Sequence, residues 1–210
     1  MRNLTHLFSV LAIAPIILTG PAHNIVAHAQ TTASIPETSK SLAKPKATKT
    51  RVEKLDSLFT ELKKESDQRK AKILASQIAM NWTSSGSHTA NALMAWAQQA
   101  MKSGQHNKAL ELLDQVIALV PDYSEGWNRR ATLHYMMRNH AKSMADIEQT
   151  LALEPRHFGA LSGMASILAS RGNDDKALKV YEHVLSIYPA NRTAQASIIK
   201  LTQKLEKSEI

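Results

Sequence analysis

The stretch LVPDYSEGW at residues 119–127 returns in altered form as LEPRHFGAL at 153–161 and as IYPANRTAQ at 187–195. Each copy contains one proline, and the interval from Pro121 to Pro155 equals the interval from Pro155 to Pro189. A proline ends a helix because it lacks a backbone N–H and clashes with the preceding turn. Helix stops at a constant interval predict a tandem array of equal units.

Dividing the chain at these prolines gives three units, at residues 90–123, 124–157 and 158–191, in which residue size recurs at equal offsets. Position 4 is Leu93, Trp127 and Leu161; position 8 is Ala97, Ala131 and Ala165; position 20 is Ala109, Ser143 and Ala177; position 28 is Ile117, Leu151 and Leu185. Positions 4 and 8 share one helix face, and positions 20 and 28 share a face of a second helix. Small residues at positions 8 and 20 let the two helices approach closely, so each unit is predicted to be a helix pair.

A glycine at position 15, Gly104 or Gly172, suits the turn between the two helices. With these features, the segment 90–191 resembles the tetratricopeptide repeat (TPR) family, whose helix-turn-helix repeat has the same length as these units. The resemblance implies an all-α fold, a right-handed helical solenoid with three clear repeats. Repeat two departs from the pattern with Arg138 at the turn, Ser143 at the small position 20, and Arg130 where leucine is usual.

Two flanking segments complete the expected array. Residues 53–89 are predicted to form a degenerate helix pair, because counting back one repeat length from Leu93 and Ala109 leads to Phe59 and Ala75. Residues 192–210 are predicted to form a capping helix and tail, with apolar residues on one face only. Hydrophobic residues make up 43% of the 210-residue chain, and aromatic residues only 5%. We therefore expect an all-helical body of about nine helices.

The N-terminal segment 1–29 has the three parts of a secretory signal peptide. Arg2 precedes an apolar run, and Ala27 and Ala29 are the small residues before a predicted cleavage after Ala29. A membrane-spanning helix needs about 20 apolar residues, whereas this run is shorter and interrupted by Pro15. A retained membrane anchor stays open as the alternative. The chain has no cysteine for disulfides or lipid attachment, and we expect an exported, periplasmic protein.

Residues 30–52 lack an apolar period and are rich in Thr, Ser, Lys and Ala, which predicts a disordered linker. This segment holds five Lys or Arg residues against one acidic residue, whereas residues 53–210 hold twenty against seventeen. Such a basic tail can make weak contact with an anionic envelope surface. A tether that only improves solubility is the alternative.

Positions 2, 5, 9 and 12 of each first helix share a face distinct from the packing face. By resemblance to TPR proteins, this face lines a concave groove that receives a peptide or a partner helix. The predicted groove residues are Asn91, Met94, Gln98 and Met101 in repeat one, Glu125, Asn128, Arg129, Thr132 and Tyr135 in repeat two, and Ser162 and Ser166 in repeat three. Their amides can bind a peptide backbone, and Tyr and Met add apolar contact. The alternative is that these are ordinary solvated helix positions. Repeat three offers only small residues, so that end either admits a bulky group or binds little.

Some TPR proteins hold the C-terminal carboxylate of chaperones with Lys, Asn and Arg side chains. The matching positions here include Met94, Gln98, Gly159 and Gly163, which carry no charge. The sequence therefore argues against a carboxylate clamp. Arg129 is the one charged exception, and it can pair with an acidic partner or with Glu125 one turn earlier.

Other function classes find little support in the sequence. The chain contains no HExxH pair, glycine-rich phosphate loop or serine nucleophile elbow, so we expect no enzyme, cofactor or metal. An isoelectric point near 9.7 suits nucleic acid, but the predicted export argues against such a partner. We expect a periplasmic adaptor or scaffold that binds a protein or peptide of unknown identity. An envelope-structural protein that binds polyanions or membrane surfaces through its basic tail is the alternative.

Overall fold

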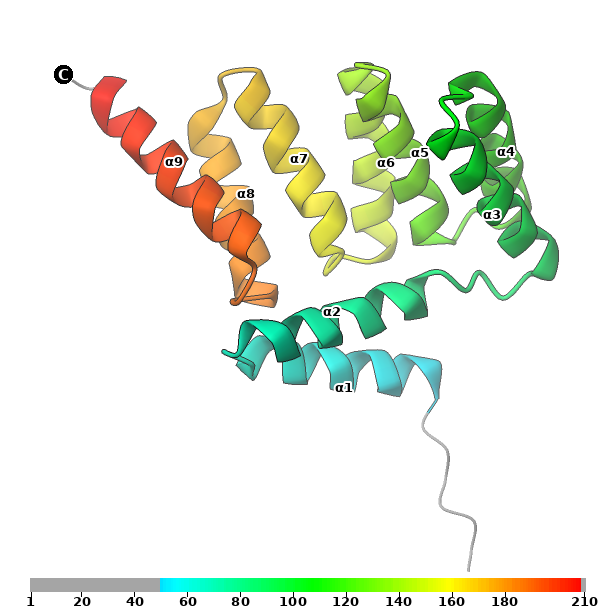
Figure 1. The fold of residues 1–210 in the computed structure, drawn as a ribbon, viewed down its shortest axis with the longest axis horizontal. Helices are drawn as coiled ribbons and strands as arrows, with labels where there is room; N and C mark the ends of the chain where they lie inside the picture. Colours follow the sequence, from blue (N-terminus) through cyan, green and yellow to red (C-terminus); the bar gives the residue numbers. More distant parts are fainter. Residues whose placement is uncertain (1–49, 209–210) are drawn as a thin grey trace, which may run out of the picture. The chain divides into compact units, whose positions relative to one another are not determined.

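The computed structural model describes residues 50–208. The predicted signal segment 1–29, its cleavage site and most of the predicted linker 30–52 lie outside these residues. The described part contains nine α-helices and no strand (Figure 1), which confirms the prediction of an all-helical fold. The helices are α1 (Arg51–Lys64), α2 (Gln68–Trp82), α3 (His88–Lys102), α4 (His106–Leu119), α5 (Ser124–Met136), α6 (His140–Leu153), α7 (Phe158–Ser170), α8 (Asp174–Ile187) and α9 (Arg192–Ser208).

The three central helix pairs follow the predicted repeat. Within the repeats, α3 packs on α4, α5 on α6 and α7 on α8, and each second helix also packs on the first helix of the next pair. The small residues at positions 8 and 20 are all buried, as close helix approach requires: Ala97, Ala109, Ala131, Ser143, Ala165 and Ala177. The Ser143 hydroxyl donates a hydrogen bond of 2.8 Å to the carbonyl of Ala131, so its polar atom is satisfied inside the pair.

The turn inside each repeat requires a left-handed residue. Gly104 and Gly172 have φ angles of 69° and 76°, and Arg138 takes the same conformation with a φ of 59°. The next residue in each repeat closes the turn with a backbone hydrogen bond to the carbonyl five positions earlier: Gln105 to Ala100, Asn139 to His134 and Asn173 to Leu168. The arginine therefore preserves the turn geometry at a cost in backbone strain.

Local capping interactions define the first two helices. The Thr50 hydroxyl accepts from the backbone N–H of Glu53, whose carboxylate in turn accepts from the backbone N–H of Thr50. This capping box starts α1 at Arg51, two residues before the predicted start of the helical region at 53. The Asp67 carboxylate caps α2 by accepting from two backbone N–H groups of its first turn.

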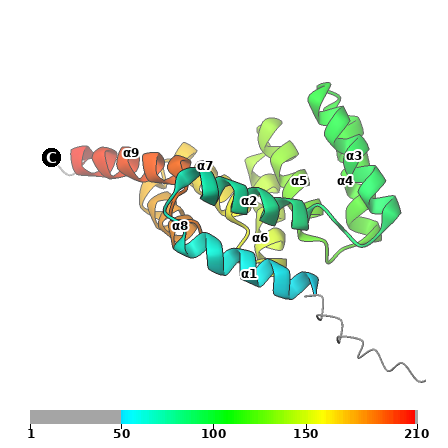
Figure 2. The ribbon, with the colours of Figure 1, turned by 60° about the horizontal axis from the view of Figure 1, so that its bottom comes forward.

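Helices α1 and α2 form a pair, but their packing differs from that of a further repeat. Figures 1 and 2 show the pair folded back along the ends of the later helices instead of stacked on α3 and α4. Its core residues, among them Phe59 and Trp82, pack with Phe158, Tyr188 and Ala190, which lie at the start of α7 and just after α8. The aromatic residues that receive the pair, Phe158 and Tyr188, lie at helix ends beside the links. The helical register therefore did not predict this location.

The folded-back position leaves one face of α3 open. Trp96 stands at position 7 of repeat one, and its side chain is 60% exposed. At the same position in repeat two, Arg130 bonds to Asp114 on the second helix of the preceding repeat. Trp96 therefore lies where a preceding repeat would pack.

At the other end of the array, α9 packs against α8 and buries Ala194 and Leu201 in the core of the third repeat. Its opposite side is largely polar. In the part of the chain that the structure describes, no helix combines the length and the apolar character needed to cross a bilayer.

Candidate partner-binding groove

An opening of about 180 Å³ lies between the first helices of repeats two and three. Its lining comes from α5, α6 and α7: Asn128, Ala131, Thr132, Tyr135, Ser143, Ile147, Gly159, Ala160, Gly163 and Ser166. The buried members, such as Ala131, Ile147 and Ala160, form an apolar floor. Thr132 and Tyr135 are exposed, so the rim carries hydroxyl and amide groups.

Two glycines one turn apart on α7 leave this space free. A Cβ atom on Gly163 would lie 3.4 Å from the Cδ1 atom of Ile147, and one on Gly159 would lie 3.3 Å from the His157 ring. A side chain at Gly163 would therefore extend into the opening or press on its floor, and one at Gly159 would extend into the opening or press on the His157 ring. Both glycines have ordinary helical backbone angles. They matter at these positions because they have no side chain, and not because of their backbone conformation.

The structure brings together four of the eleven predicted groove residues around this opening, namely Asn128, Thr132, Tyr135 and Ser166. Sequence reasoning missed the contribution of Ile147 and Ala160 to the floor. The signal for the opening was the run of small residues in repeat three, for which room for a bulky group was one of two open interpretations.

Two predicted groove residues lie in the interior. Met101 is buried with Ala97 and Leu133, because its face of α3 meets the neighbouring repeat. Glu125 is only 6% exposed and is enclosed by hydrogen-bond donors. The structure therefore corrects the predicted placement of Met101 and Glu125 on the groove surface.

Glu125 is the centre of a buried polar network. Its carboxylate accepts hydrogen bonds from Asn128 at 2.7 Å, from Arg129 at 2.5 Å and from the His157 Nε2 atom at 3.2 Å. His157 Nδ1 accepts from the backbone N–H of Ala160, so the proton of the neutral ring lies on Nε2. Burial opposes ionisation of Glu125, but the His157 hydrogen bond and the Arg129 charge outweigh it and hold the pKa of Glu125 below its ordinary value.

The remaining predicted residues make contacts within the protein. Arg129 donates to the Gln98 side chain at 2.7 Å, which joins repeat two to repeat one. The side-chain Oδ1 atom of Asn91 accepts hydrogen bonds from the backbone N–H and the hydroxyl of Ser85, which lies in the link before α3. Ser162 donates to a carbonyl of its own helix, and Met94 packs partly buried beside the core of repeat one.

A second opening of about 350 Å³ continues the same face from α7 to α9 and shares Ser166 with the first. Ser166 and Tyr181 are hydrogen-bonded at 3.0 Å where the two openings meet. Lys200 and Lys204 line the α9 side, and Lys204 pairs with Asp174 at 2.6 Å. The face thus changes from uncharged to basic along the array.

The described residues hold no cluster of three or more His, Cys, Asp or Glu side chains arranged to bind a metal ion.

The repeating helix pairs and the face formed by their first helices define a repeat protein of the TPR type. Two profiles described as tetratricopeptide repeat match residues 90–133 and 160–195. A TPR repeat-containing protein of Rhizobium etli is 45% identical over 196 residues, which covers 93% of this chain and 89% of that protein. The chain therefore belongs to the tetratricopeptide repeat family, as the sequence predicted.

Solved TPR domains share the fold at low sequence identity. The first TPR of Spaghetti (RPAP3), bound to an HSP90 peptide, is 22% identical with a TM-score of 0.55, over 57% of this chain and 95% of that one. The Sgt2 TPR domain from Aspergillus fumigatus is 18% identical with a TM-score of 0.54, over 59% and 83%. MamA is 22% identical with a TM-score of 0.53, over 56% and 68%. TPR domains are protein–protein interaction modules.

Proposed function

We propose that this chain is an adaptor or scaffold that binds a segment of a partner protein in the opening between α5 and α7. The observation that carries the proposal is an apolar floor surrounded by uncharged polar groups from two consecutive repeats. Cavities of about 150 Å³ admit a benzene-sized group, so an opening of about 180 Å³ suits one apolar side chain. Asn128 and Thr132 then offer hydrogen bonds to the backbone on either side of that anchor.

The charge distribution favours an apolar anchor over a terminal carboxylate. Arg129, the one cation among the predicted groove residues, is already held by Glu125 and Gln98. The residues that line the opening include no Lys or Arg side chain that could bind an acidic group. The family consists of interaction modules, and the proposal assigns this chain no catalytic role.

The site of action proposed is the periplasm, on the basis of residues 1–29, which resemble a secretory signal peptide. Fractionation of cells that produce the full chain, followed by N-terminal sequencing, tests this directly. We expect a mature chain that begins at Gln30 in the periplasmic fraction. A full-length chain in the membrane fraction would support the retained anchor instead.

The binding proposal is tested with a displayed library of random twelve-residue peptides selected on the purified chain 30–210. The test variant is Gly163→Leu, which fills the opening, and the matched control is Ala152→Leu on the exposed surface of α6. We expect the selected peptides to share one apolar residue and to lose at least about ten-fold in affinity for the Gly163→Leu variant, or roughly 1.4 kcal/mol. The Ala152→Leu variant should bind like the wild type.

Peptides that bind the Gly163→Leu variant as well as the wild type would contradict the proposal. Binding that survives Gly163→Leu but disappears after deletion of residues 30–49 and in moderate salt would favour the alternative function of the basic tail.

A further inference from the structure

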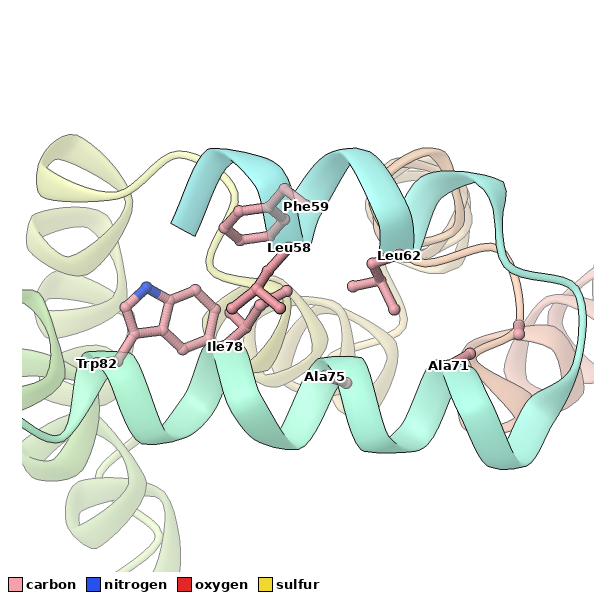
Figure 3. Packing of buried hydrophobic residues seen from close by; sticks show 8 residues of the cluster. Leu58, Phe59, Leu62, Ala71, Ala75, Ile78 and Trp82 are labelled. Carbon is pink, nitrogen blue, oxygen red and sulfur yellow. The ribbon is translucent and has the colours of Figure 1, made fainter. Parts of the chain in front are cut away.

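Trp82, the last residue of α2, contacts His157 in the buried polar network around Glu125. The indole ring of Trp82 stacks on the His157 imidazole, with 4.0 Å between ring centroids and 11° between ring planes. His157 is 2% exposed, so the indole closes this side chain off from water. Figure 3 shows Trp82 on the same side of α2 as Ile78 and Ala75, directed toward α1 and the shared core.

From His157 the contacts lead to both walls of the opening. Its Nε2 atom donates to Glu125, and Glu125 accepts from the side chain of Asn128, which lines the opening on α5. Its Nδ1 atom accepts the backbone N–H of Ala160, which lines the opening on α7. One imidazole thus fixes the start of α7 and, through Glu125, the amide of Asn128.

We propose that Trp82 is a positioning residue for the opening between α5 and α7, and that the α1–α2 pair thereby controls partner binding. The inference rests on the proposed function of that opening. The flat indole holds the imidazole plane so that its two nitrogens face Glu125 and Ala160, and it keeps water from competing for them. Displacement of the α1–α2 pair exposes His157 and frees the Asn128 side chain.

The contacts around Trp82 indicate that the ring itself is what matters. The Nε1 atom of Trp82 has no hydrogen-bond partner among the described residues. A phenylalanine therefore retains a stacking ring without losing a polar contact. A leucine retains apolar volume without a ring, so the two replacements separate stacking from general packing.

Two readouts are measured on the chain 30–210 for Trp82→Leu, Trp82→Phe and Met80→Ala. Met80 lies on the exposed side of α2, with 69% of its surface accessible, and is the matched control. The first readout needs no ligand: the NMR signals of the Asn128 side-chain amide and the hydrogen exchange of the Ala160 amide. The second is the affinity for the tightest twelve-residue peptide selected on the wild-type chain.

We expect Trp82→Leu to shift the Asn128 signals and to speed Ala160 exchange about ten-fold through local opening. Its peptide affinity should fall at least about five-fold, roughly 1 kcal/mol. Trp82→Phe and Met80→Ala should resemble the wild type in both readouts.

A further variant, His157→Asn, covers the case in which Trp82→Leu does not fold. Asparagine can still cap the start of α7 but is too short to reach Glu125. We expect Ala160 to stay protected while the Asn128 signals shift.

The inference is overturned if Trp82→Leu leaves the Asn128 and Ala160 signals unchanged, or changes them without changing peptide affinity. It is also overturned if Trp82→Phe behaves like Trp82→Leu at equal thermal stability, because packing alone then explains the effect. If no peptide is selected at all, the proposed function fails. The ligand-free readout still decides in that case whether Trp82 positions Asn128.

Discussion

Arg138 stands at a position where the repeat requires a left-handed backbone conformation. It occupies the turn between α5 and α6 with a φ of 59°, the left-handed region that Gly104 and Gly172 occupy in the other repeats. A side chain in this region crowds the backbone and costs roughly 1–2 kcal/mol relative to glycine. The turn keeps its hydrogen bonds, so the array tolerates this strain.

We predict that Arg138→Gly raises the free energy of unfolding by about 1 kcal/mol, because relief of backbone strain exceeds the entropy that glycine adds to the unfolded chain. Gly172→Ala should lower it by a similar amount. Urea unfolding of both variants and the wild type measures the two differences. A loss of stability in Arg138→Gly would show that the arginine side chain contributes more than its backbone strain costs.

His134 provides a prediction about pH. This side chain is buried, and burial lowers its pKa, although the neighbouring Asp146 carboxylate opposes that shift. In the unfolded chain the pKa returns to about 6.5. Below that pH the unfolded state binds protons that the folded state does not. The contribution of His134 is therefore fully present above pH ~6.5 and is lost as the pH falls from there through the lower pKa of the folded state.

We predict that the wild type loses more stability between pH ~7.5 and pH ~5.5 than His134→Leu does, because the variant lacks this titration. Urea unfolding at the two pH values provides the comparison, and titrating groups that do not contact His134 contribute equally to both proteins. Equal losses in the two proteins would contradict the burial of an uncharged imidazole at this position.

Between elements, Arg130 joins the first two repeats with ion pairs where an apolar residue was expected. Its guanidinium donates two hydrogen bonds to Asp146 on α6, at 2.9 and 2.7 Å, and one to Asp114 on α4, at 2.7 Å. The group also lies 4.9 Å from the centre of the Trp127 ring. Asp146 is buried, so its charge depends on this partner.

We predict that Arg130→Leu, the residue usual at this position in the family, lowers the free energy of unfolding by about 3 kcal/mol, because the buried Asp146 carboxylate loses its partner. The double variant Arg130→Leu/Asp146→Ala should recover part of that loss. A double-mutant cycle measured by urea unfolding gives the coupling energy of the pair. A single variant as stable as the wild type would mean that apolar packing can replace the ion pairs outright.

The arrangement of the elements was only partly predictable. Phe59 and Ala75, found by counting back one repeat length, are indeed buried. Helical register determines which face of a helix is buried, but it does not determine which surface covers that face. For α1 and α2 that surface includes Phe158 and Tyr188, which stand beside the helix links and become neighbours only in the folded chain.

Across the whole molecule, the repeat and the face formed by its first helices followed from the sequence more readily than the candidate site itself. Tyr135 and Asn128 lie at the predicted face because spacing alone selects it. Met101 and Glu125 have the same spacing, but contacts with other helices bury them. Such contacts depend on how successive repeats pack, which the pattern of one repeat does not contain.

We propose above that the opening between α5 and α7 receives a partner segment. The most direct measurement is crosslinking in the producing cells with a photoreactive phenylalanine at Tyr135, beside the opening, or at Leu153 on α6 as the control. Both side chains are 42% exposed, so general accessibility is matched. We predict one discrete adduct from position 135 that disappears in the Gly163→Leu background, and none from position 153. The same adduct from both positions, or one that persists when the opening is filled, would contradict it.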